Sequence, residues 1–219
     1  MERYFILDKY NTWYDWDLVL TAKTITPPEL KTNYVDIDGV SGTIDLSESL
    51  TGEITYKDRT ISASFWTNKG NRRDRERLLR DITIALHGKK IKVIEPDDPT
   101  HYFIGRVAIK SLKNILPYAE FTIDIICEPW RYAIEDTVRT VSISSSTSVD
   151  VVVCNNGAKT VCPTIKVSGT VTITYGGVSL HNLTEGTYKS PDIKLKHGVN
   201  LLNVSGEGAV VITYKEADL

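Results

Sequence analysis

Apolar and polar residues alternate with period two along most of the chain, which is the pattern of strands that bury one face. The alternation is regular in segments 91–94, 101–109 and 120–127. These segments are separated by the turn Pro96-Asp97-Asp98-Pro99 and by a break near Pro117. The pattern predicts a mainly β protein.

The same alternation predicts a hairpin over residues 51–65. Ile54 and Tyr56 alternate with polar residues, and Ile61 resumes the pattern after Lys57-Asp58-Arg59, which reads as a polar turn. We therefore expect two adjacent strands joined at that turn.

One segment departs from period two and predicts the only helix. Asn71 can cap its start, Asp74 places a carboxylate in the first turn, and Gly88 can end it in a left-handed conformation. The apolar positions fall at helical spacings and form one stripe, which we expect to pack against the sheet: Leu78, Leu79, Ile82, Ala85 and Leu86.

The texture of the sequence changes after residues 128–132, which predicts two domains, 1–133 and 134–219. The second part is rich in Ser, Thr and Val, and short β-branched runs over 164–167, 171–175 and 209–214 are separated by glycine-containing turns. Gly176-Gly177 and Gly206-Glu207-Gly208 both read as hairpin turns. This spacing favours a compact antiparallel β-sandwich.

The composition is that of an ordinary globular protein. The 219 residues are 41% hydrophobic and 25% charged, and the net charge of −2 lacks the basic excess of a duplex-binding protein. The first residues lack the apolar stretch of a signal peptide and no later stretch suits a membrane span, so synthesis in a cytoplasm and no membrane association are expected. The three cysteines cannot all pair and read as small apolar fillers: Cys127, Cys154 and Cys162.

No pattern of catalytic or cofactor-binding residues stands out, so we expect no enzyme activity, cofactor or metal. The four histidines lack zinc-site spacing, and no nucleophile elbow, phosphate loop or dinucleotide fingerprint is present. The carboxylate pairs Asp36 with Asp38 and Asp97 with Asp98 read as solvated loop acids. A cell-wall hydrolase, the enzyme alternative, would need a cleft with convergent carboxylates or a Cys/His pair.

Two clusters are candidates for subunit contact. Arginines dominate residues 72–80, and this cluster could bind phosphate, form a solvated helix face, or contact another subunit, of which we favour the last. Trp13, Tyr14 and Trp16 crowd the start of the chain, where stacking on a sugar ring competes with burial at a subunit or tube interface. The predicted interface residues are Trp13, Trp16, Arg72, Arg73, Arg77 and Arg80.

Several motifs follow one another in a fixed order. An aliphatic run at 17–25 and a spacer with Pro27-Pro28 lead to a glycine turn, a Leu-Ser-Glu segment, a Thr-Gly pair and a Tyr-x-x-Arg strand: Gly39, Leu46-Ser47-Glu48, Thr51-Gly52, Tyr56 and Arg59. The order and spacing resemble the N-terminal domain of the siphophage distal tail protein family. Segments 127–132, 156–157, 163–167 and 198–200 extend the resemblance across nearly the whole chain, whereas residues 215–219 lack that family's aromatic ending.

The resemblance implies a non-enzymatic hub of a bacteriophage tail tip. It implies a hexameric ring of β-rich N-terminal domains, each bearing one helix, with galectin-like antiparallel β-sandwiches as C-terminal domains. The expected partners are the tail tube protein, the tail-tip or tail-associated protein and a receptor-binding protein, while genome DNA passes the lumen without specific binding. The expected location is the virion tail, after synthesis in the cytoplasm of a bacterial host.

The alternative function is a carbohydrate-binding module of a phage tail that recognises the cell surface. Residues 138–219 contain no tryptophan and only three tyrosines, so a platform for stacking sugars is poorly supplied. We therefore expect no measurable sugar affinity. Exposed aromatic side chains on a concave sheet face would favour the alternative.

Overall fold

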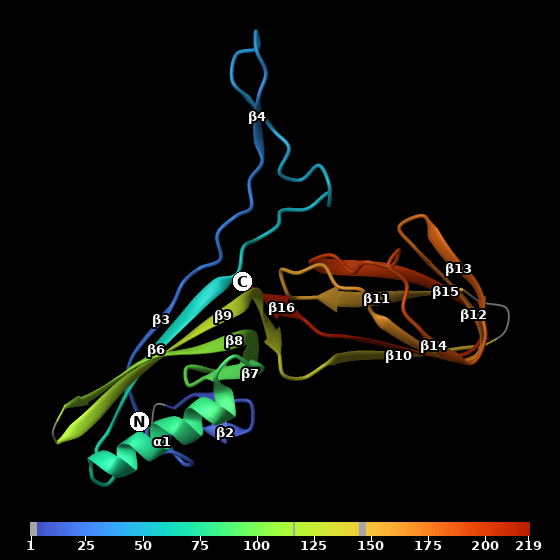
Figure 1. Cartoon of the computed structure of the whole chain (residues 1–219). Coiled ribbons are helices and arrows are strands. Elements are labelled where there is room, and N and C mark those ends of the chain that lie inside the picture. Colours follow the sequence, from blue (N-terminus) through green and yellow to red (C-terminus); the bar gives the residue numbers. More distant parts are fainter. Residues whose placement is uncertain (1–3, 116, 145–147) are drawn as a thin grey trace. The chain divides into compact units, whose positions relative to one another are not determined.

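The computed structural model describes residues 4–115, 117–144 and 148–219. The predicted fold class is confirmed, because the described chain is mainly β with one helix (Figure 1). It divides into two compact units, the first running to Arg131 and also including Leu219, and the second covering Tyr132–Asp218.

The first unit is built on an antiparallel sheet with the strand order β2-β1-β7-β8-β9-β6-β3. The predicted strands at 91–94, 101–109 and 120–127 are confirmed as parts of β7, β8 and β9. The strand bounds are β1 (Ile6–Leu7), β2 (Tyr10–Asn11), β3 (Val19–Ile25), β6 (Arg59–Thr67), β7 (Lys90–Glu95), β8 (Asp98–Ile115) and β9 (Tyr118–Ala133). The short strand β16 (Ala217–Asp218) belongs to the second unit.

The core of this unit lies on one face of the sheet. Along β6 every second residue is buried, and Phe65 stands opposite Phe121 of β9 with its ring stacked at 5.4 Å between centroids. Phe5 meets the edge of Phe65 at 6.3 Å. Because neighbouring strands turn the same alternation toward this face, aromatic and aliphatic side chains form one continuous core.

Helix α1 (Arg72–Leu86) begins and ends where the sequence predicts. The Asn71 side chain accepts hydrogen bonds from the backbone N–H groups of Arg73 (2.9 Å) and Asp74 (3.2 Å), and the Asp74 carboxylate accepts one from the Asn71 N–H (3.0 Å). This reciprocal capping box satisfies donors that a helix start leaves open. Gly88 follows with a positive φ of 75°, and Ile82 and Leu86 of the predicted stripe are buried in the core.

An ion-pair cluster joins the edge strand β3 to the other side of the curled sheet. The Lys23 ammonium group contacts the Glu95 carboxylate at the end of β7 and lies 2.7 Å from the Asp97 carboxylate in the turn that follows. Burial works against the charged lysine, but the hydrogen bonds to Asp97 and Glu95 outweigh it and raise its pKa. Lys23 and Glu95 therefore link β3 and β7, two strands that are not neighbours in the sheet.

Residues 26–58 leave the sheet between β3 and β6 and form an arm that extends away from it (Figure 1). The arm contains its own two-stranded ladder of β4 (Tyr34–Asp36) and β5 (Thr43–Asp45). The predicted hairpin over 51–65 is wrong: Tyr56 makes only an isolated bridge to Leu30, and β6 pairs with β3 and β9 instead. Those two strands offer β6 a shared core, which residues 51–58 do not.

The second unit is an antiparallel assembly around two long strands, with the order β10-β15-β12-β13, to which β11 adds on β15 and β14 adds on β12. Its buried residues form a separate core. The strands are β10 (Thr137–Ile143), β11 (Val149–Asn155), β12 (Thr164–Tyr175), β13 (Val178–Leu183), β14 (Gly186–Tyr188) and β15 (Gly198–Tyr214).

Both long strands turn a corner at glycines. The prediction of a hairpin at Gly206-Glu207-Gly208 is wrong, because these residues lie inside the continuous strand β15, opposite Gly169 and its neighbours on β12. Gly208 has a φ of 138°, and a Cβ there would lie 1.9 Å from the Ser168 carbonyl oxygen. Such a close backbone approach requires glycine. The Gly176-Gly177 turn is confirmed, since Tyr175 pairs with Val178.

Two buried asparagines fasten the loops of the second unit. The Asn155 amide donates to the carbonyls of Lys159 (2.9 Å) and Leu195 (3.1 Å). The Asn200 amide donates to Val153, Lys196 and Gly198 carbonyls, and its Oδ1 accepts from the Lys196 N–H (2.9 Å) and the Tyr175 hydroxyl (2.7 Å). Because both side chains are almost fully buried, these bonds replace the water they have lost.

The cysteines do not all behave as predicted. Cys127 is buried in the core of the first unit, as expected of an apolar filler. Cys162 is half-buried, whereas Cys154 is exposed on β11. The residues of β11 alternate in burial, and Cys154 falls on the outward positions.

Candidate functional site

The four arginines predicted to contact another subunit are exposed on helix α1: Arg72, Arg73, Arg77 and Arg80. The Arg72 Nε donates to the Glu76 carboxylate at 3.1 Å. Arg75, in the same sequence cluster, is buried and its Nη1 donates to the Gly70 carbonyl at 2.9 Å. The structure thus separates one structural arginine from four that a partner could reach.

The aromatic residues predicted to lie at a subunit contact also differ in exposure. Trp16 is only 8% exposed, belongs to the core of its own unit and stacks on Tyr10 at 4.9 Å. Trp13 is half-buried in the turn before β3, where the Asn11 side chain accepts its backbone N–H at 2.9 Å. Tyr14 is 67% exposed. A partner at this turn would therefore meet Tyr14 and part of Trp13, and only the edge of Trp16.

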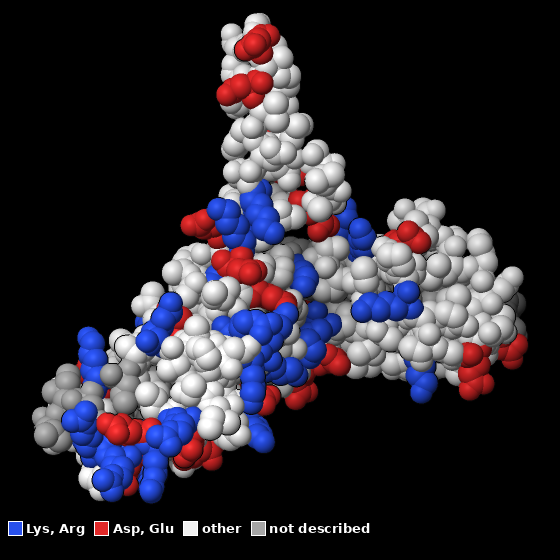
Figure 2. Space-filling view, viewed as in Figure 1, with Lys and Arg blue, Asp and Glu red and all other residues white. Residues whose placement is uncertain are grey.

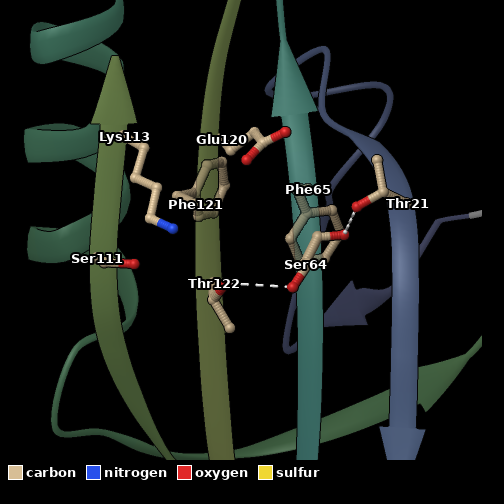
Figure 3. A pocket seen from close by; sticks show the side chains of 8 residues that line it. All are labelled: Thr21, Ser64, Phe65, Ser111, Lys113, Glu120, Phe121 and Thr122. Carbon is tan, nitrogen blue, oxygen red and sulfur yellow. Dashed lines mark hydrogen bonds between the residues drawn. The ribbon is translucent and has the colours of Figure 1, made fainter. Parts of the chain in front are cut away.

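A polar hollow of about 170 Å³ lies over strands β3, β6, β8 and β9 (Figure 3). The Thr21 hydroxyl donates to the Ser64 carbonyl at 2.9 Å, and the Ser64 and Thr122 hydroxyls share a hydrogen bond of 3.1 Å. Lys113 and Glu120 supply the charges of its wall. The lining holds hydroxyls without a histidine, so it resembles a polar surface more than a nucleophilic site.

The described residues hold no group of three or more His, Cys, Asp or Glu side chains placed to bind a metal ion. In that same part of the chain, none of the helical structure is long and apolar enough to cross a membrane. Of the two acid pairs, the second has local partners: Asp97 contacts Lys23, and Asp98 contacts His101 and Arg131.

The second unit keeps its described aromatic side chains against its own chain. Tyr175, Tyr188 and Tyr214 are buried or half-buried, and their hydroxyls donate to Asn200 (2.7 Å), Thr184 (2.9 Å) and Cys154 (2.5 Å) respectively. The exposed residues of β11 and β15 include aliphatic ones such as Val152 and Val199 instead. The exposed aromatic platform that would favour carbohydrate binding is not found among the described residues of this unit.

The arm presents a surface that sequence reasoning missed. Its exposed apolar side chains include Leu50, which is 97% exposed, together with Leu30, Tyr34, Val35, Ile37, Val40, Ile44, Leu46 and Ile54. So many exposed apolar side chains on one segment are typical of a protein contact. The sequence does contain a signal for this exposure. Single aliphatic residues are mixed there with Gly, Ser and acidic residues, so no regular apolar face is available for burial in the chain's own core.

Fold and surfaces together define a mainly β, two-unit protein whose candidate sites are contact surfaces. No family model and no curated protein matches the sequence. Among solved structures, the chain is similar to that of the SPP1 Dit (gp 19.1) protein, described as a paradigm of the hub adsorption apparatus in phages that infect Gram-positive bacteria. The TM-score is 0.74 at 14% sequence identity, and the match covers 97% of this chain and 98% of that chain.

This similarity agrees with the family resemblance that the sequence motifs gave, and it covers both units. At 14% identity, this is a likeness of fold.

Proposed function

We propose that the chain is a structural subunit of a bacteriophage tail tip, a hub that forms a hexameric ring between the tail tube and the tip or baseplate with its host-adsorption apparatus. The observation that carries the proposal is the likeness to the SPP1 Dit protein across nearly the full length of both chains. A likeness confined to one unit could reflect a β domain that many unrelated proteins share. This likeness extends over both units.

Surface properties support an assembling role. The exposed apolar residues of the arm and the exposed arginines of α1 leave an isolated subunit with surfaces that are typical of protein contacts. In a closed ring each subunit contributes two different surfaces, one to each neighbour. A chain with two unlike contact surfaces is suited to that symmetry.

The proposed partners are the tail tube protein on one side of the ring, a tail-tip or tail-associated protein on the other, and a receptor-binding protein at the periphery. Genome DNA would pass through the lumen without specific binding, in keeping with a net charge of −2. The chain would act in the virion tail and carry no catalytic activity.

The proposal is tested by measuring the mass of the purified chain by light scattering from micromolar to millimolar concentration, with negative-stain images of any large species. We expect a six-subunit particle with a central hole. A chain that stays monomeric over this whole range would contradict the ring. Equilibration at each concentration matters, because a weak ring assembles by mass action.

A further inference from the structure

The arm is acidic as well as apolar. Residues 32–56 contain no lysine or arginine and five carboxylates: Asp36, Asp38, Asp45, Glu48 and Glu53. Figure 2 shows acidic side chains and no basic ones toward the tip of the arm. Asp36, Asp38 and Glu48 form no side-chain ion pair or hydrogen bond with any described residue, so their charges are available to a partner.

Helix α1 carries the opposite charge on its exposed side. Arg73, Arg77, Arg80 and Ile84 follow one another at spacings of four, three and four residues, which places them on one stripe of the helix. We call this the α1 stripe. The three arginines are exposed and form no ion pair with a described residue, and Ile84 is 70% exposed.

The acids of the same helix compensate the stripe only in part. Asp74 is held in the capping box, and Glu76 is paired with Arg72. Asp81 is therefore the one acidic residue of α1 left to offset the charge of the three arginines. The α1 stripe therefore presents a net positive, partly apolar surface, and the helical rise makes it about 17 Å long from its first residue to its last.

We propose that, within the ring proposed above, the arm of one subunit docks on the α1 stripe of a neighbouring subunit. The inference rests on the proposed function, because it needs a second copy of the chain. A net negative arm meets a net positive helix face, and each brings exposed apolar side chains that would leave water on contact. About five residues of extended arm span the length of the stripe.

The two surfaces differ in kind, so the contact is heterologous. One copy uses its arm and the next uses its helix, and repetition of this contact closes a ring or extends a filament. The arm's apolar residues are exposed in the single chain, so its own helix does not bury them. A second copy supplies that cover.

The test reverses the charge of each surface in turn. The helix variant carries Arg73→Glu, Arg77→Glu and Arg80→Glu, and the arm variant carries Asp36→Lys, Asp38→Lys and Glu48→Lys. Each is measured beside the wild-type chain by sedimentation and light scattering up to millimolar concentration, with circular dichroism to verify folding. We expect each reversal to raise the dissociation constant of the assembly at least about tenfold.

Mixing the two variants is the decisive step. In an alternating ring, the unaltered arm of the helix variant meets the unaltered helix of the arm variant, and the two reversed surfaces meet each other. An equimolar mixture should therefore recover assembly, and native mass spectrometry should find both variants in equal number. A matched control reverses three exposed cations of the second unit, Arg139→Glu, Lys166→Glu and Lys194→Glu, and should assemble like wild type.

The outcomes separate this inference from the proposed function. A wild-type ring that both reversals leave intact overturns the arm-to-helix contact, assigns the arm to a different protein and leaves the hub proposal standing. Folded variants that dissociate alone but do not reassemble in the mixture also overturn the pairing. A wild-type chain that is monomeric at every concentration overturns both the ring and the contact within it.

Discussion

Arg59 lies opposite Cys127 in the register of β6 and β9, with its guanidinium group 5.4 Å from the centroid of the Phe103 ring. Arg59 is only 5% exposed, and neither its Nε nor its Nη2 has a hydrogen-bond partner among the described residues. Burial is the main cause that lowers the pKa of Arg59, and the nearby Arg131 also lowers it. The core of the first unit therefore holds a cation with an aromatic neighbour but no described anion.

Replacing Arg59 by methionine is expected to leave the free energy of unfolding unchanged or to raise it by about 1 kcal/mol, because a buried charge without a partner is replaced by an apolar chain of similar length. Urea unfolding followed by tryptophan fluorescence measures this. Arg75→Met is the comparison, and it should destabilise because Arg75 donates to the Gly70 carbonyl. A loss of more than about 2 kcal/mol in Arg59→Met would show that the guanidinium is well bonded.

Phe121→Ala should destabilise the first unit by about 3–5 kcal/mol, since it removes a buried ring that stacks on Phe65 and leaves a cavity. The adjacent Thr122 points to the opposite face of β9, where its hydroxyl meets Ser64. Thr122→Ala should cost about 1 kcal/mol. Equal losses in these two variants would contradict the assignment of the core to one face.

Gly208→Ala should severely destabilise the second unit, because its Cβ would meet the Ser168 carbonyl at 1.9 Å and its φ of 138° strains any side chain. Gly177→Ala, with a φ of 84° and no atom within 4 Å of its Cβ, should cost only about 1 kcal/mol. All four tryptophans lie at or before residue 130, so fluorescence reports the first unit. Circular dichroism should therefore lose a transition in Gly208→Ala while the fluorescence transition stays unchanged.

Stability should fall in acid partly through Asp98. Burial opposes its ionisation, but hydrogen bonds from Thr100 and His101 outweigh burial and lower its pKa. A carboxyl whose folded pKa lies below the unfolded value stabilises above the unfolded pKa, and this contribution is lost as pH falls through the folded one. Asp98→Asn should reduce the pH dependence of unfolding below about pH 4. Asp38→Asn, at an exposed position, is the control, and the same reduction there would contradict the role of Asp98.

Thiol reactivity should distinguish the cysteines in the native chain. Burial is the main cause that raises the pKa of Cys127 to about 12, so at pH 8 its thiolate is scarce as well as inaccessible. A thiol reagent should label the exposed Cys154 first and Cys127 only after unfolding. Cys154→Ser should remove the fast phase, and a fast phase that persists in this variant would disprove the assignment.

Local signals predicted the helix well. The cap at Asn71, the carboxylate of Asp74 and the stop at Gly88 act within a few residues, so the sequence near each of them contains most of the information. Strand partners are different, because pairing depends on segments far apart in the chain. The alternation at Ile54 and Tyr56 suggested a neighbour for β6, yet β6 found better cover between β3 and β9.

The roles of some glycine and aromatic residues could not be predicted from the sequence for a related reason. Gly206 and Gly208 have the composition of a turn, and only the approach of β12 shows that they serve a corner inside a strand. Trp16 was predicted to contact another subunit, and the structure places most of its ring against Tyr10 in the core of its own unit. The exposed arginines of α1 could be assigned to the surface from helical spacing, whereas the arm could not, because exposure there follows from the absence of anything to pack against.

The corner in the second unit also bears on how that unit opens. The ladder between β12 and β15 continues without a break from Thr164 opposite Thr213 to Thr174 opposite Asn203, so the same two strands serve both of its ends. No seam therefore separates one half of the sandwich from the other. Amide hydrogens along β12 and β15 should exchange together in a single cooperative opening, and a protein built on such a unit would resist partial unfolding until the whole unit opens.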